Sequence, residues 1–257
     1  MILKDGIHMK TSTAFILTAA MALSFTGCDS SIIGSKACYT STDEVTLEKL
    51  IENSSPLKMV EYKGGFKEVI DYSGSGIENM DDGEFYTSYK KTGSLLEVNY
   101  VSKYPDAYSS CGYISNDKDD PYVYSKNPMG ITKNELKEED IDQTFSTTVL
   151  GYIDFDASLE NVTEKDGNYI ATVKISQEGE EIGTDTITLD PKSGMILKVK
   201  STQQDGDKEL EVISEFTYTK DIEIDSTPKT EYRDPVEAEE VTGTAGEASE
   251  NAETNAN

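Results

Sequence analysis

Residues 168–218, NYIATVKISQEGEEIGTDTITLDPKSGMILKVKSTQQDGDKELEVISEFTY, decide the fold of this chain. Hydrophobic and polar residues alternate along the stretch, and turn sequences such as Glu178-Gly179 and Asp205-Gly206 separate the alternating runs. An alternation of period two places successive side chains on opposite faces of a strand. The stretch therefore predicts consecutive antiparallel strands with one apolar and one polar face.

The hydrophobic positions of these runs form a candidate apolar sheet face. Its members are Tyr169, Val173, Ile175, Ile187, Leu189, Leu197, Val199, Leu210, Val212 and Phe216. The intervening positions are mostly Thr, Lys and Glu, which suit a surface in water. The predicted strands lie near 158–164, 168–176, 180–189, 195–203, 208–218 and 221–225.

The region from 57 to about 124 also predicts strands, because runs rich in Tyr and Val alternate with turns that contain Gly. The runs are KMVEYK, FKEVIDYS, FYTSYKK, LLEVNYVS and YVYS. Two sequences match the capping box, in which Ser or Thr precedes Glu by three residues. Ser41 to Glu44 predicts a helix over about 43–53 that ends before Pro56, and Thr132 to Glu135 predicts a helix through about Gln143.

Together these elements predict a mainly β (α+β) fold. We expect a curved antiparallel sheet or half-open barrel of about ten strands, with two or so covering helices. Two helices of moderate length are few for a sheet of about ten strands, which leaves two alternatives for the apolar face. Either the sheet curls around its own side chains, or an apolar cavity remains that can hold a hydrophobic ligand.

The N-terminal segment predicts export and a lipid anchor. Residues 9–28, MKTSTAFILTAAMALSFTGC, have a basic start, a short apolar run and small residues before a cysteine, as in a secretory signal peptide. The apolar run is shorter than the roughly 20 residues of a transmembrane helix. Phe25-Thr26-Gly27-Cys28 resembles the lipobox of bacterial lipoproteins, which implies that Cys28 becomes the lipidated first residue; an ordinary signal peptide is the alternative. Met9 is a better start than Met1 for such a segment.

Four parts of the chain follow from this. They are a lipoprotein signal peptide over 1–27, a lipidated tether over 28–40, a single β-rich domain over 41–226 and a disordered acidic tail over 227–257. After Pro228 the chain has eight acidic and two basic residues and lacks Ile, Leu and Phe, so it cannot bury a core of its own. We expect the protein to be attached through Cys28 to the outer face of the cytoplasmic membrane.

Charge and composition exclude several functions. With 49 Asp and Glu against 23 Lys and Arg, the formal net charge is -26, which disfavours nucleic acid as a partner. The one histidine, His8, precedes Cys28, so the mature chain has no histidine for a catalytic triad or a typical zinc site. Asp154 with Asp156, and the run 116–120, lack the spacing of a calcium loop, which favours solvated loops. We therefore expect no metal, no cofactor and no enzymatic activity; a glycosidase-type pair of carboxylates among the 49 acidic residues is the enzymatic alternative.

Cysteines and tyrosines leave further alternatives. Cys38 and Cys111 are a candidate disulfide in an exported protein, or else two free thiols. Eight tyrosines lie between Tyr86 and Tyr124, where their rings could line a sugar- or peptide-binding surface. The alternative that we favour is the ordinary preference of Tyr for half-buried strands, which requires no function.

A family resemblance rests on the second half of the chain. Leu189-Asp190-Pro191-Lys192-Ser193-Gly194, then Met195 to Val199, a DG hairpin, Phe216-Thr217-Tyr218 and Ile222-Glu223-Ile224 resemble the closing strands of LolA/LppX-type lipid-carrier lipoproteins. The resemblance implies a strongly curved sheet, capped by helices, that encloses an apolar cavity for acyl chains. The predicted function is a non-enzymatic binder of an apolar or amphiphilic ligand. The alternative is a cell-surface protein-interaction or envelope-structural module, whose protein partner is unknown.

Overall fold

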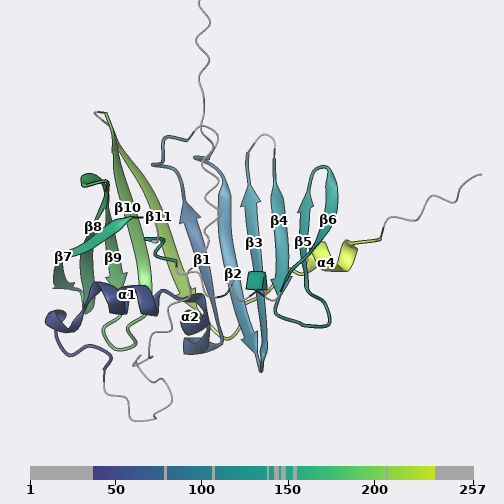
Figure 1. Ribbon diagram of the computed structural model, residues 1–257, viewed down its shortest axis with the longest axis horizontal. Helices are drawn as coiled ribbons and strands as arrows, with labels where there is room; N and C mark the ends of the chain where they lie inside the picture. The colour runs from purple at the N-terminus through teal and green to yellow at the C-terminus, as the bar shows by residue number, and fades with distance from the viewer. Residues whose placement is uncertain are drawn as a thin grey trace, which may run out of the picture.

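The computed structural model describes residues 37–77, 80–105, 108–137, 139–141, 145, 149–152, 155–206 and 208–234. Within these residues eleven strands form one antiparallel sheet in the order β6-β5-β4-β3-β2-β1-β11-β10-β9-β8-β7 (Figure 1). The strands are β1 (Gly65–Asp71), β2 (Glu84–Thr92), β3 (Leu95–Lys103), β4 (Ser110–Ser115), β5 (Tyr122–Asn127), β6 (Gly130–Glu135), β7 (Asp156–Lys165), β8 (Asn168–Gln177), β9 (Glu180–Leu189), β10 (Ile196–Asp205) and β11 (Lys208–Tyr218).

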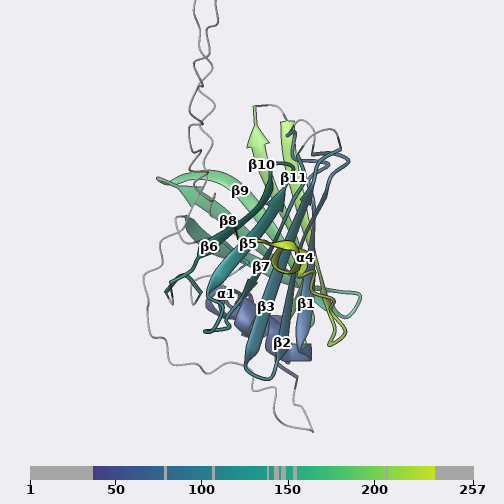
Figure 2. The same cartoon turned by 90° about the vertical axis from the view of Figure 1, so that its right-hand side faces the viewer.

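The sheet consists of two meanders joined at its centre. Strands β1 to β6 form one meander and β7 to β11 the other, and β1 pairs with β11 so that Phe66 lies opposite Tyr218. The sheet is not closed, because β6 and β7 are its two edges. Figure 2 shows β8 and β9 running at a steep angle to β2 and β3, so the sheet is strongly twisted and curved. The predicted mainly β class, with a half-open curved sheet and covering helices, is confirmed.

The first covering helices differ from the prediction in detail. The capping box at 41–44 forms only a single 3-10 turn, η1 (Thr42–Glu44), and the Ser41 side chain makes no cap hydrogen bond. Helix α1 (Leu47–Asn53) begins later, where the Thr46 hydroxyl accepts the backbone N–H of Lys49 at 3.3 Å. Thr46 therefore caps the helix that was expected to start at 43.

Pro56 starts a helix instead of only ending one. Helix α2 (Pro56–Lys63) has Pro56 in its first turn and ends at Gly64, whose φ of 82° suits glycine. The strand predicted for KMVEYK is therefore wrong. Met59 and Val60 are buried, and the Tyr62 ring meets that of Tyr218 edge-on at 5.6 Å, so packing against the sheet selects the helix.

The second capping box is also a wrong prediction, because Thr132 to Glu135 lies in β6. This strand pairs with β5 through a tight turn between Asn127 and Gly130. Residues 139–141 and 145 of the following segment are helical, and Ile141 and Phe145 are buried in the core. Strand β4, over Ser110–Ser115, was not predicted.

The strands predicted for the second half are confirmed from β7 to β11, with one exception and one change of register. Residues 221–225 are extended but pair with no described strand. A β-bulge between Ile196 and Lys198 turns Ile196, instead of the predicted Leu197, into the core. Six members of the predicted apolar face are in the core, namely Tyr169, Val173, Ile187, Leu189, Val199 and Phe216.

The ordered domain extends beyond both predicted boundaries. Tyr39, expected in the tether, is only 1% exposed, and its backbone N–H donates to the Pro191 carbonyl oxygen at 2.9 Å. At the other end, α4 (Thr227–Glu231) occupies the predicted start of the tail and packs on β4 and β5. The predicted signal peptide, Cys28 and residues 235–257 lie outside the described residues. In the part of the chain that is described, no helix is long and apolar enough to cross a membrane.

The candidate disulfide between Cys38 and Cys111 is not formed, because Cys111 is a free thiol. Cys38 packs on the turn between β9 and β10, where its backbone N–H donates to the Lys192 carbonyl oxygen at 3.0 Å. Cys111 lies in β4, five strand positions from β10. At about 4.8 Å per strand this separation far exceeds the roughly 7 Å that a disulfide allows between Cα atoms.

Candidate functional site

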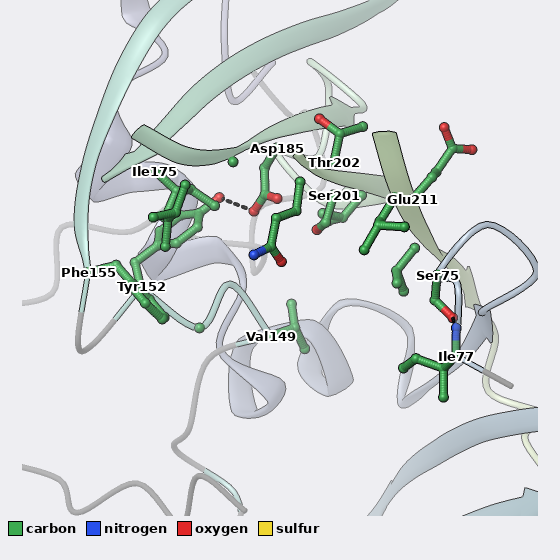
Figure 3. A pocket seen from close by; sticks show the side chains of 17 residues that line it. Ser75, Ile77, Val149, Tyr152, Phe155, Ile175, Asp185, Ser201, Thr202 and Glu211 are labelled. Atoms are coloured by element: carbon green, nitrogen blue, oxygen red, sulfur yellow. Dashed lines mark hydrogen bonds between the residues drawn. The ribbon is translucent and has the colours of Figure 1, made fainter. Parts of the chain in front are cut away.

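An apolar cavity of about 370 Å³ lies on the inner face of the second meander, which is the face that carries core residues such as Ile187 and Leu189 (Figure 3). Its floor comes from β8 to β11, and its cover from the loop after β1 and the segment before β7. Four members of the predicted apolar face line it, namely Ile175, Val199, Leu210 and Val212. Other members of this face, such as Leu189 and Phe216, pack in the core.

The cavity exists because the helices are too short to cover the sheet. Helices α1 and α2 have seven and eight residues, which at 1.5 Å per residue makes each about 10–12 Å long. A ten-residue strand such as β9 or β10 is about 33 Å long. In Figure 1 both helices lie toward one end of the sheet, and the β10–β11 hairpin extends away from them. The uncovered part of the apolar face must be closed by irregular segments.

The loop that follows β1 provides one side of the cover. The Glu211 backbone N–H donates to the Gly74 carbonyl oxygen at 2.7 Å, which ties the loop to β11. A side chain at position 74 would meet Glu211, since an added Cβ would lie 2.9 Å from the Glu211 Cβ. The Ser75 hydroxyl then accepts the Ile77 backbone N–H at 3.2 Å, as Figure 3 shows. Ile77 consequently stands at the rim with 50% of its surface exposed.

The segment before β7 provides the other side. The Val149 backbone N–H donates to the Ser54 carbonyl oxygen at 3.0 Å, and the neighbouring Leu150 is buried in the core. Phe155, 38% exposed, completes the rim. Only six large hydrophobic side chains are exposed in the described residues, and two of them, Ile77 and Phe155, belong to this rim. Exposed apolar groups at the mouth of an apolar cavity are typical of a ligand site.

Two acidic residues, Asp185 and Glu211, belong to this lining, and Glu211 forms an ion pair with Lys200. Asp185 of β9 is only 5% exposed, and the Tyr152 hydroxyl donates to its Oδ2 at 2.6 Å (Figure 3). Its Oδ1 is buried and has no hydrogen-bond partner in the described part of the chain. Burial and the Asp185 carboxylate raise the pKa of Tyr152 far above its usual value, so Tyr152 stays protonated and donating.

The sequence contained a signal for Asp185 that the prediction missed. Asp185, Ile187 and Leu189 alternate along β9, so they share a face. Asp185 lies opposite Val173 of β8 and Ser201 of β10. A carboxylate on the apolar side of an alternating strand therefore marks the site. The same alternation could not identify the segments that cover the cavity, because loops have no regular periodicity.

A second cavity, of about 540 Å³, lies on the outer face of the first meander. Residues 221–225 cover it, and its floor includes Lys67, Tyr86 and Asn99. The Lys67 ammonium lies 3.7 Å from the centre of the Tyr86 ring, and Asn99 accepts the backbone N–H of Asp225 at 3.3 Å. This space is more polar than the first, and the two contacts involve the Lys67 ammonium and the Asn99 side-chain oxygen.

The tyrosine-rich region does not form one binding surface. Tyr89 stacks on Phe66 at 4.5 Å between ring centres in the core. Tyr113 and Tyr124 lie on the other face, where their hydroxyls donate to Glu97 and Asp120 at 2.9 and 2.7 Å. These tyrosines serve both faces of the sheet, as ordinary strand preference predicts.

The acidic positions considered for calcium are used otherwise. Asp120 forms an ion pair with Lys229 at 2.6 Å, and Asp117 accepts the backbone N–H of Asp119 at 3.0 Å. Asp156 is exposed at the start of β7, whereas Asp154 lies outside the described residues. No group of three or more side chains able to hold a metal ion occurs among the residues that the structure describes.

Fold and cavity together define a class: an open, curved antiparallel sheet with an apolar pocket on its inner face. No family model and no curated protein matches the chain in sequence. Solved structures with a similar fold include lipoprotein LppX of Mycobacterium tuberculosis, with 7% identity, a TM-score of 0.39, and coverage of 69% of this chain and 97% of LppX.

Two further solved structures are similar. A LolA-superfamily protein of Nitrosomonas europaea has 8% identity and a TM-score of 0.28, with coverage of 70% of this chain and 96% of that protein. The MucA/MucB complex of Pseudomonas aeruginosa has 12% identity and a TM-score of 0.35, and the match covers 67% of this chain and 56% of the matched chain. The predicted LolA/LppX-like resemblance is thus present as a likeness of fold, and the function proposed below rests on the cavity of this chain.

Proposed function

We propose that this protein binds an apolar or amphiphilic ligand in the cavity on the inner face of β8 to β11, and that its role is binding, not catalysis. The observation that carries the proposal is an apolar sheet face that the helices leave uncovered and that Ile77 and Phe155 rim. The volume of about 370 Å³ falls within the range of roughly 300–1,000 Å³ of small-molecule sites, toward its lower end. A single slender ligand suits this space.

A bulky side chain on the cavity floor tests the proposal. Val212 of β11 lines the cavity, so Val212→Phe fills part of the space that a ligand needs. We expect the wild-type protein to bind diphenylhexatriene, an uncharged apolar fluorophore, saturably, and Val212→Phe to bind it about ten-fold more weakly, a loss of about 1.4 kcal/mol. Fluorescence titration measures both.

The matched control is Val69→Phe. Val69 lies in β1 and is 46% exposed, outside the cavity lining, so the same substitution there leaves the ligand space unchanged. We expect this variant to bind the fluorophore like the wild type. Absence of saturable binding to the wild type, or equal weakening by both substitutions, would refute a ligand site in this cavity.

We further propose that the protein is exported and anchored through lipid on Cys28 to the outer face of the cytoplasmic membrane. The signal-peptide pattern of residues 9–28 and its lipobox-like end support this. With a formal net charge of -26, the chain itself has no electrostatic attraction to an anionic membrane surface, so attachment depends on the acyl chains.

The alternative function, an interaction module that adds a partner's strand to a sheet edge, has less support. The edge strand β7 exposes Glu160, Glu164 and Lys165, and charged side chains oppose pairing with another strand. We therefore place the function in the cavity.

A further inference from the structure

We propose that the ligand of this cavity carries a protonated amine and that Asp185 binds it. The proposal rests on the proposed function, since it assumes a ligand between β8 and β11, and it names the chemical class of that ligand. The feature behind it is the buried Asp185 Oδ1, which lines the apolar cavity without a hydrogen-bond partner in the described residues.

The carboxyl group is held in place by the protein. The Tyr152 hydroxyl donates to Oδ2 at 2.6 Å and thereby fixes the orientation of the group. Oδ1 then remains as the open acceptor inside the cavity. A buried acceptor without a donor is rare in folded proteins and costs free energy, so a donor on the ligand would stabilise the occupied state.

The cavity itself supplies no positive charge. Its lining includes neither Lys nor Arg in the part of the chain that is described. The lysines of the neighbouring strands pair with glutamates instead, as Lys174 does with Glu181 at 2.6 Å and Lys200 does with Glu211. Lys174 lies opposite Thr184, whose side chain points to the other face from that of Asp185. The negative charge of Asp185 is therefore left for a ligand to balance.

Low polarity around the carboxylate decides which ligand it prefers. Ile175, Ile182, Val199, Leu210 and Val212 share the cavity with it. In such surroundings an ammonium group interacts with a carboxylate more strongly than a neutral hydroxyl does, because charge-assisted hydrogen bonds are the stronger ones. A fatty acid or another anionic group would instead be repelled. The geometry thus selects a cationic amphiphile over a neutral or anionic one.

The position of Asp185 also gives the direction of binding. Its neighbour across the sheet, Val173, is fully buried, so Asp185 lies where the cavity meets the core. Ile77 and Phe155, in contrast, are exposed at the rim. The amine therefore enters first, and the apolar chain extends toward the rim.

Three probes that share a twelve-carbon alkyl chain test the preference for an amine: dodecylamine, dodecanol and dodecanoate. Each is titrated into the mature protein by calorimetry, below its critical micelle concentration. We expect dodecylamine to bind at least about ten-fold more tightly than dodecanol, and dodecanoate more weakly than either. Asp185→Asn preserves size and the bond to Tyr152 but removes the charge. It should weaken dodecylamine about ten-fold and leave dodecanol unchanged.

Glu160→Gln is the matched control, because it removes one negative charge from an exposed position of β7 outside the cavity lining. It should retain the preference for the amine. The wild-type comparison of amine with alcohol stands even if Asp185→Asn fails to fold.

Three results would overturn the proposal: equal binding of amine and alcohol by the wild type, a preference of the wild type for dodecanoate, or an unchanged preference for the amine in Asp185→Asn. If amine and alcohol bind equally and Val212→Phe weakens both, the amine inference fails while the apolar site stands; if no probe binds the wild type, both fail.

Discussion

Glu68 lies on the inner face of β1, opposite Phe216 of β11 and Thr87 of β2. Burial raises the pKa of its carboxyl above the usual value, against a hydrogen bond with Ser214 that lowers it. Burial and the nearby Glu68 charge also raise the pKa of Tyr89 far above its usual value. This glutamate therefore opposes folding when it is ionised.

A pH-dependent stability follows from the raised pKa of Glu68. The folded state binds this proton more tightly than the unfolded state, so the contribution of Glu68 is fully present below the unfolded pKa of about 4.3 and is lost as pH rises through the folded pKa. We expect Glu68→Gln to be more stable than the wild type at pH 8 and equally stable near pH 4. Urea unfolding at both pH values measures this.

Glu84→Gln serves as the control for this measurement. Glu84 is exposed, and its hydrogen bond and charge interaction with Lys103 lower the pKa of its carboxyl. Its pH dependence has the opposite sign, so removing the charge should give no gain at pH 8. Equal effects of both substitutions would show that net charge, and not the burial of Glu68, governs the change.

Among the secondary-structure elements, α1 does not begin at the capping-box sequence that precedes it. Ser41 begins a capping-box sequence, yet the Thr40 backbone N–H and hydroxyl bind the Glu44 carboxylate at 2.6 and 2.7 Å. The helix is capped by Thr46 instead. A short motif supplies the groups that can form cap hydrogen bonds, but the packing of the following residues determines which of these bonds form.

Two alanine substitutions distinguish these capping residues. Thr46→Ala removes the hydroxyl that accepts the Lys49 N–H, so we expect a loss of about 1 kcal/mol in the free energy of unfolding. Ser41→Ala removes no cap hydrogen bond, and its effect should stay within about 0.5 kcal/mol. Chemical denaturation of both variants checks the difference. A larger loss in Ser41→Ala would mean that the motif at 41–44 is the effective cap.

The sequence predicts the second meander well for a physical reason. Its strands are long, alternate over most of their length and end at Gly turns, as at Gly179 and Gly206, where φ is 85° and 62°. In the first half, KMVEYK and Thr132 to Glu135 are short and fit either a helix or a strand, so contacts distant in sequence decide. Similarly, the sequence predicts the apolar floor of the cavity, but neither its irregular cover nor the bulge that replaces Leu197 by Ile196.

At the scale of the whole molecule, two different parts serve the two proposed roles: Cys28 attaches the protein to the membrane, and the cavity binds the ligand. Tyr39 is buried in the core, so the folded domain begins close to Cys28 in the sequence, and an acyl anchor there would hold the domain near the membrane. The described surface carries cross-strand ion pairs such as Lys198 with Glu215 at 2.9 Å, which are exposed and contribute little to stability.

Cys28→Ala tests the anchor. Without the thiol no lipid can be attached, so we expect the variant to move from the membrane fraction to the soluble fraction, and incorporation of labelled palmitate to be lost. Cys111→Ala, which changes a free thiol in β4, is the control and should stay with the membranes. Membrane retention of Cys28→Ala would refute lipidation at this residue.

The pairing of β1 with β11 has a consequence for how the chain acquires its structure. Phe66 and Tyr218 become neighbours only after nearly the whole domain has been made, so the central pair of the sheet is also its most distant pair in sequence. Closing so long a loop makes folding slow. Until β11 arrives, β1 has one unpaired edge, which can associate with other chains. A protein translocated from its N-terminus would therefore emerge with this edge of β1 unpaired, because β11 is the last strand of the sheet along the chain.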